Sequence, residues 1–66
     1  MSWDNMKANW KDEKGDVRKR WDRLSDDEMD EIQGQRDVLV KKIHERYGIP
    51  WEEAEAQVKE WEGLRF

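Results

Sequence analysis

The feature that most constrains this chain is the helical spacing of its apolar residues, among which tryptophan replaces much of the usual aliphatic content. Leu, Ile, Val and Phe make up only about 17% of the 66 residues, below the ~20% level at which disorder becomes the usual outcome. Each large aromatic side chain can bury ~150–250 Å² and so opposes that tendency. Projected at about 100° per residue, every tryptophan falls on the apolar stripe of its own segment. We therefore predict a helical core that contains all five tryptophans: Trp3, Trp10, Trp21, Trp51 and Trp61.

The length and composition of the chain exclude several classes of protein. Sixty-six residues support one domain, which we place at 1–66. No cysteine is present, which excludes disulfide scaffolds and thiolate metal sites. The longest apolar run, 38–40, is far shorter than the ~20 residues of a membrane span, and the first residues do not resemble a signal peptide. We expect a cytoplasmic, monomeric protein without a membrane span.

Gly15 interrupts the first helical pattern. The apolar phase continues through Gly15, so one long helix is conceivable. A helix of that length would span ~33 Å, whereas a globule of this size has a radius of gyration of only about 11 Å. We therefore predict a break at Gly15, with helices over 3–14 and 16–23 and Asp16 as the cap of the second.

Capping and breaking residues also define the later helices. The segment 25–28, Ser-Asp-Asp-Glu, is a capping box that predicts a helix beginning at Asp26. Gly34 either bends this helix or splits it, while Gly48 and Pro50 predict a helix end followed by a new start. The expected helices are 26–33, 35–47 and 51–62. No segment alternates with period two, so the fold class is all-α, a compact array of four to five short helices without strands.

The inventory of reactive side chains is poor. With one histidine, two serines and no cysteine, neither a nucleophilic triad nor a His-based metal site can be assembled. The acidic run 26–31 fails as a calcium loop because Glu31 stands where the loop needs glycine, and we interpret it as charge that complements a helix N-terminus. His44 is interpreted as a residue at the boundary of the core. We predict no enzyme activity and no catalytic, cofactor-binding or metal-binding residues.

One basic cluster is the main candidate binding surface. It consists of Arg18, Lys19, Arg20 and Arg23. Charge of both signs alternates along the chain, which fits a solvated surface laced with helical i,i+4 pairs such as Asp16 with Arg20. Nucleic-acid binding usually needs a concentrated basic face, so it is the less favoured hypothesis, and the partner stays unknown.

Two further positions stand apart from the helical pattern. Arg36 falls in the middle of an apolar stripe, so either a bend at Gly34 rotates it outward or it is partly buried and paired with a carboxylate. We include it among the candidate binding residues. Leu64 and Phe66 lie off the last apolar arc and are the only candidates for a self-association surface.

The ordered set of these residues resembles the CsbD-like family of small bacterial general-stress proteins. The resemblance covers about 3–61, and the residues that carry it are Asn9-Trp10-Lys11, Lys14-Gly15, Val17, Trp21, Leu24-Ser25-Asp26-Asp27, Gly34, Arg36-Asp37, Leu39-Val40, Lys42-Ile43, Glu45-Arg46-Tyr47-Gly48, Ala54-Glu55, Val58 and Trp61. It implies a helical array similar to SAM domains, made of orthogonal helical hairpins, and production under stress. It supplies no catalytic residues. Ala8, Lys41 and Pro50 depart from the family pattern.

Two functions follow as hypotheses. The leading one is a non-enzymatic general stress-response protein that protects or binds macromolecules through its charged surface. The alternative is a nucleic-acid or anionic-surface binding module that uses the basic cluster at 18–23.

Overall fold

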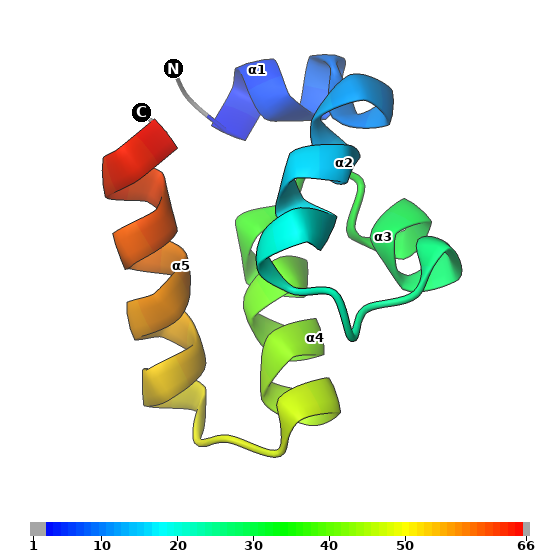
Figure 1. Ribbon diagram of the computed structural model, residues 1–66. Helices are drawn as coiled ribbons and strands as arrows, with labels where there is room; N and C mark the ends of the chain where they lie inside the picture. The colour runs from blue at the N-terminus through cyan, green and yellow to red at the C-terminus, as the bar shows by residue number, and fades with distance from the viewer. Residues whose placement is uncertain (1–2, 66) are drawn as a thin grey trace.

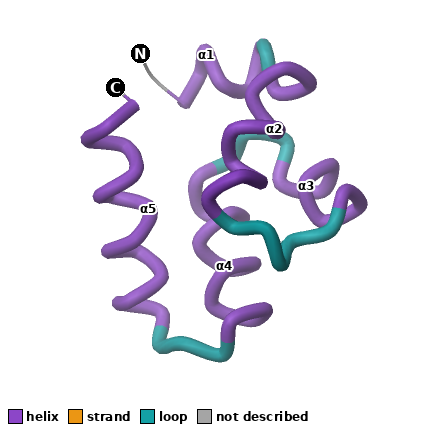
Figure 2. Tube along the Cα trace, viewed as in Figure 1, coloured by secondary structure: helices purple, strands orange, loops and turns teal. Residues whose placement is uncertain are grey.

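The structure is a computed structural model that describes residues 3–65. Five helices and no strands occur in this part of the chain, which confirms the predicted all-α class. Figure 1 shows their arrangement, and Figure 2 shows how short the loops between them are. The helices are α1 (Trp3–Ala8), α2 (Trp10–Arg20), α3 (Asp26–Ile32), α4 (Arg36–Tyr47) and α5 (Trp51–Arg65).

The last two helices form an antiparallel hairpin that is the largest packed unit of the fold (Figure 1). α4 ends at Gly48, whose φ of 63° is the left-handed conformation that glycine tolerates best. Two residues later the Pro50 carbonyl accepts the backbone N–H groups of Glu53 and Ala54, which starts α5. The buried faces carry Leu39, Val40 and Ile43 on α4 and Ala54, Val58 and Trp61 on α5.

The predicted break at Gly15 is wrong. α2 runs through Gly15 without interruption, and the chain breaks at Asn9 instead. Gly15 is exposed and nothing lies within 4 Å of the position its Cβ would occupy, so no contact requires a turn there and the cost is only the ~1 kcal/mol helix penalty of glycine. Asn9 has φ −116° and ψ 25°, and its carbonyl accepts the backbone N–H groups of Asp12 and Glu13 in the first turn of α2. α2 then ends at Arg20, earlier than expected, because Trp21 turns into the core.

Gly34 splits the third pattern into two helices, α3 and α4. Gln33 and Gly34 both have positive φ, 50° and 75°, and this pair reverses the chain. Gly34 is buried against the backbone of α1: a Cβ at this position would lie 2.8 Å from the Lys7 Cα. Only glycine meets both requirements, the left-handed φ and the close approach of another helix.

The core is apolar and includes most of the tryptophans. Thirteen hydrophobic residues are buried in one cluster, and no polar or charged residue among 3–65 is buried. Trp21 is fully buried, and the rings of Trp3 and Trp21 lie 6.0 and 5.9 Å from that of Trp61. Trp10 donates from Nε1 to the Met29 carbonyl at 2.7 Å. These indoles therefore supply core area where the chain lacks aliphatic residues, and they join α1 and the end of α2 to α5.

Trp51 contradicts the prediction that all five tryptophans are core. It is 42% exposed at the first position of α5. Its ring lies edge-on to His44 at 5.7 Å, and its Nε1 donates to Glu55 on the same helix at 3.1 Å. A residue in the first turn of a helix lies at the rim of the hairpin, so the correct helical phase does not ensure burial. Leu64 is 84% exposed, and Phe66 lies outside the described residues.

Candidate functional site

The basic cluster lies at the end of α2 and in the turn that follows it. Arg18, Lys19 and Arg20 occupy the last turn, where cations complement the helix dipole. The Trp21 backbone N–H bonds the Val17 carbonyl and closes the helix. Burial of Trp21 leaves the basic side chains around it in solvent, and all four members of the cluster are exposed.

The four cations of the cluster have two different kinds of partner. Arg18 forms an ion pair with Asp26 at the start of α3, and the Lys19 Nζ lies 3.9 Å from an Asp16 carboxylate oxygen. The guanidinium of Arg20 instead stacks over the Trp21 ring at 5.1 Å, and that of Arg23 stacks over the ring of Tyr47 at 5.6 Å. Within residues 3–65 neither stacked arginine has a carboxylate partner.

Arg36 is partly buried and paired, which confirms the second of the two alternatives. Its Nε donates to the Glu62 Oε1 at 2.9 Å, and both side chains are less than one-third exposed. The other oxygen of Glu62 accepts the Nε1–H of Trp3 at 2.9 Å. One carboxylate of α5 thus holds the first residues of both α1 and α4. Arg36 therefore joins α4 to α5, and none of its polar contacts in residues 3–65 is with the basic cluster.

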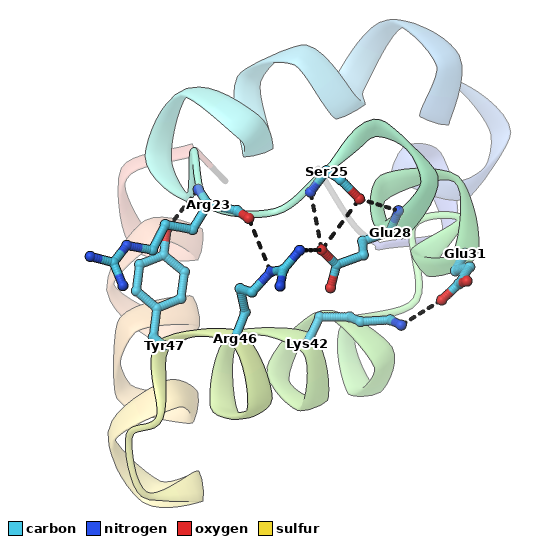
Figure 3. A network of polar contacts seen from close by, with 7 residues as sticks. All are labelled: Arg23, Ser25, Glu28, Glu31, Lys42, Arg46 and Tyr47. Atoms are coloured by element: carbon cyan, nitrogen blue, oxygen red, sulfur yellow. Dashed lines mark hydrogen bonds and ion pairs between the residues drawn. The ribbon is translucent and has the colours of Figure 1, made fainter.

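The acidic helix α3 makes more contacts than its sequence predicts. The capping box is present as expected: the Ser25 side chain accepts the Glu28 backbone N–H, and the Glu28 carboxylate accepts the Ser25 N–H. In addition, Glu28 pairs with Arg46 at 3.0 Å and Glu31 pairs with Lys42, both from α4 (Figure 3). The carboxylates therefore complement cations on a neighbouring helix as well as the dipole of α3.

The same network fixes the loop between α2 and α3. Arg46 Nε donates to the Arg23 carbonyl at 3.2 Å, and the Arg23 N–H donates to the Tyr47 hydroxyl at 3.3 Å (Figure 3). The last turn of α4 thereby holds the backbone of Arg23 in place, while the Arg23 guanidinium lies over the Tyr47 ring.

Two groups in this network have shifted proton affinities. The pKa of Glu28 is lowered, chiefly by the hydrogen bond from the Ser25 backbone N–H. Desolvation opposes this shift, and the charge of Arg46 adds to it. The pKa of Lys42 is raised, chiefly by its hydrogen bond to Glu31. Both shifts favour the charged forms, so both groups remain ionised at neutral pH.

The C-terminal end of α5 carries a further contact that the sequence did not indicate. Arg65 reaches two carboxylates of α2, Glu13 and Asp16, and its guanidinium lies 5.8 Å from the Trp61 ring centroid. Asp16 was expected to pair with Arg20 one turn along its own helix. Sequence spacing reveals pairs within a helix, but it contains no signal for a contact across 49 residues.

His44 lies at the edge of the core. Its side chain is half-buried, and its Nδ1 lies 2.6 Å from the Ile49 carbonyl, which ties α4 to the turn before α5. No other His, Cys, Asp or Glu in residues 3–65 joins it in a group of three that could hold a metal ion. No pocket is found on this part of the molecule. None of its helices has both the length and the apolar character that a bilayer crossing requires.

Comparison with known proteins finds close relatives in bacteria. The chain is 48% identical over 62 residues to the UPF0337 protein YjbJ of Escherichia coli strain K12, covering 94% of this chain and 90% of the relative. It is 47% identical to the UPF0337 protein ECA0631 of Pectobacterium atrosepticum over the same shares of the two chains. It is also 47% identical to the UPF0337 protein NE2439 of Nitrosomonas europaea, covering 88% of this chain and 62% of the relative. No protein-family model and no solved structure matches the chain.

Proposed function

The chain belongs to the UPF0337 family of CsbD-like proteins, and on that premise we propose that it is a non-enzymatic stress-response protein that works through its charged surface. In this proposal it acts as a cytoplasmic monomer. It protects other macromolecules by weak contacts with many partners, and no single tight ligand is required.

The division between core and surface is the observation that carries this proposal. The sparse hydrophobic residues are enclosed, and among residues 3–65 only Trp51 and Leu64 are large hydrophobic side chains left exposed. The 45% of residues that are charged therefore form most of the surface. A surface with interspersed charges of both signs stays hydrated and resists association. It can also contact partly unfolded proteins of either charge without joining their aggregates.

A protection assay tests the proposal directly. A thermolabile enzyme is heated with increasing amounts of the purified protein, and light scattering and recovered activity are measured. We expect scattering to fall with concentration and the effect to weaken at high salt, because screening reduces contacts between exposed charges. The control is an equal mass of a helical protein with few surface charges. Absence of protection at every ratio, or saturable turnover of a metabolite, would contradict the proposal.

The stacked arginines support a second candidate function, binding of an anionic polymer by the basic cluster. Arg20 and Arg23 are exposed, and their guanidinium groups are held against aromatic rings without a carboxylate partner among the described residues. A stacked guanidinium keeps its N–H donors free for phosphate.

The test of this second function replaces both stacked arginines by glutamine. Affinity for a short mixed-sequence DNA is measured at low salt, with the Lys41→Gln/Lys59→Gln protein as a control of equal charge. We expect the arginine variant alone to lose binding. Equal loss in both variants would show that only net charge matters, and no binding by wild type would remove the hypothesis.

The proposed monomer is tested at the end of α5. Leu64 is the one described residue of the C-terminal association candidates. Its side chain is 84% exposed, but the other large exposed hydrophobic residue in 3–65 is Trp51, at the opposite end of α5, so no apolar patch forms here. We expect Leu64→Ser to leave the elution volume in size-exclusion chromatography unchanged. A shift from a larger species to a smaller one would show that this end of the chain associates.

A further inference from the structure

Helix α3 lies between two sets of cations that come from different helices. α3 has acidic residues in its first turn and no basic residue in its last. Lys14 and Arg18, four residues apart on α2, pair with Asp30 and Asp26. Lys42 and Arg46, four residues apart on α4, pair with Glu31 and Glu28. We call the four cations Lys14, Arg18, Lys42 and Arg46 the masked basic face.

The matching of these charges is two-sided. Residues four apart on a helix project from the same side and are separated by a rise of about 6 Å. Each of the two flanking helices thus directs one pair of cations at α3. Asp27 is the only carboxylate of α3 without an ion pair in the part of the chain that the structure describes. Such pairing is more than dipole complementation, which would need no cation on α2 or α4.

Most of the pairing carboxylates can leave their partners without unfolding α3. The side chains of Asp26, Asp30 and Glu31 are 72%, 63% and 61% exposed. The helix itself is held by two other residues, Met29 and Ile32, which are fully buried. Rotation of the exposed side chains would therefore free the cations while the backbone of α3 stays in place.

We propose that the carboxylates of α3 compete internally for the masked basic face, and that the partner they exclude is the phosphodiester backbone of single-stranded nucleic acid. Lysine and arginine side chains bind phosphate oxygens as readily as they bind carboxylate oxygens, and arginine can do so with two parallel N–H donors. A linear phosphate polymer presents several anions at once, so it can replace several carboxylates in one binding event. Isolated anions replace them one at a time and compete poorly.

This surface goes beyond the second candidate function above. It shares only Arg18 with the basic cluster. Its four cations are paired with carboxylates of α3, whereas Arg20 and Arg23 have no carboxylate partner among the described residues. Binding through the stacked arginines would be constitutive, whereas binding through the masked basic face would increase when the carboxylates of α3 are neutralised. The two surfaces are therefore separable by substitution.

The test neutralises three carboxylates of α3 in the full chain as Asp26→Asn/Asp30→Asn/Glu31→Gln. Glu28 is kept because it completes the capping box. The control is Glu52→Gln/Glu53→Gln/Glu60→Gln, which changes the net charge equally on exposed residues of α5 that form no ion pair within 3–65. Binding of a labelled mixed-sequence single-stranded oligonucleotide is followed by fluorescence anisotropy, with circular dichroism as the check on folding.

We expect the α3 variant to bind at least about tenfold more tightly than the control. Its log–log salt dependence should be steeper by about 2, because the three cations it frees, Lys14, Arg18 and Lys42, contribute ~0.7 each on single strands. Adding Lys14→Gln and Lys42→Gln, which removes one freed cation from each flanking helix, should remove most of the gain. Adding Arg20→Gln and Arg23→Gln should not. Equal affinity of the α3 variant and the control would overturn the proposal. Loss of the gain only with Arg20 and Arg23 would assign binding to the stacked arginines instead.

A measurement on the wild-type protein tests the same proposal without depending on the folding of the variant. The oligonucleotide is titrated into labelled protein at low salt, and side-chain nitrogen resonances are followed by NMR. We expect the Lys14, Arg18, Lys42 and Arg46 signals to shift together with the carboxylate carbons of their partners. Shifts confined to Arg20 and Arg23, or no shift at all, would overturn the proposal.

Discussion

The hairpin of α4 and α5 and the three helices before it are held together in different ways. The hairpin packs two apolar faces from neighbouring helices across one short turn. The region of α1 to α3 has shorter helices and depends on contacts that reach across the chain. Trp3 bonds Glu62 across 59 residues, and Arg65 bonds Glu13 across 52. Gly34 supplies a further constraint through its close approach to the α1 backbone.

The two regions differ in whether local sequence signals or long-range contacts position their helices. The helical phase and the capping residues that encode the hairpin lie within its own segment of the sequence. The first three helices also bury apolar residues in the common core, but their positions depend in addition on a few indole N–H groups, ion pairs and one glycine. We therefore expect substitutions at these joints to have effects out of proportion to the area they bury.

The largest effect is expected for Trp21→Ala. Trp21 is fully buried, packs at a tilt against Trp61 and donates from Nε1 to Gln57 at 2.9 Å, so it joins the end of α2 to α5. Removal of such a side chain costs ~3–5 kcal/mol, which is comparable to the whole stability of a domain this small. Urea denaturation should show a largely unfolded protein. Trp51→Ala is the control, since a 42% exposed ring should cost less than about 1 kcal/mol.

A somewhat smaller loss is expected for Gly34→Ala. The alanine would have to adopt the left-handed φ of 75°, and its Cβ would lie 2.8 Å from the Lys7 Cα and 2.9 Å from the Lys7 backbone nitrogen. We expect a loss of ~2–4 kcal/mol, because strain of the backbone and overpacking add. Gly15→Ala, in open space on α2, should instead raise stability by ~0.5–1 kcal/mol. Melting temperatures that move in the same direction for both variants would contradict the role assigned to Gly34.

An intermediate effect is expected for Glu62→Ala. This change leaves Arg36 and Trp3 without their shared carboxylate. Hydrogen bonds of charged groups are worth ~1.5–3 kcal/mol when buried, and partial exposure reduces the expected loss to about 1–2 kcal/mol. Thermal unfolding checks it, with Glu60→Ala on the exposed side of α5 as a near-neutral control. Equal losses in the two variants would mean that Glu62 does not hold α1 in place.

The smallest effect is expected from pH. The folded state lowers the pKa of Glu28 from its ordinary value of 4.5, so its contribution is complete above that value and is lost as the pH falls through the folded pKa. Glu28→Gln should therefore lower stability at neutral pH and flatten the decline in acid. Denaturation midpoints at several pH values test this. Parallel curves for wild type and Glu28→Gln would show that the capping carboxylate gives no pH dependence.

Local sequence signals predicted much of the fold. The capping box at Ser25 identified the start of α3, Gly48 identified the end of α4, and the helical phase identified most of the core. The break at Asn9 was missed because asparagine there makes no side-chain cap, while Gly15 looked like a stronger signal. Helix propensity is weak, and tertiary packing decides where such breaks occur.

The candidate site was predicted less well. The basic cluster was found as a group, but its division into two ion-paired and two stacked cations depends on Asp26 and Tyr47, which belong to other helices. The sequence showed that Arg36 falls within an apolar stripe, but it gave no indication that Glu62 is its partner. Almost all ion pairs in residues 3–65 join different helices, and no i,i+4 rule identifies such partners.

Native-state hydrogen exchange at low and high salt tests the contrast between the two regions most directly. We predict that amides of α4 and α5 show the greatest protection with little dependence on salt. Amides of α1 to α3 should exchange through partial openings of lower free energy, and α3 should lose most protection at high salt because exposed ion pairs surround it. Uniform protection across all five helices, unchanged by salt, would contradict the division of the molecule into a locally encoded hairpin and an N-terminal region that also depends on long-range polar contacts.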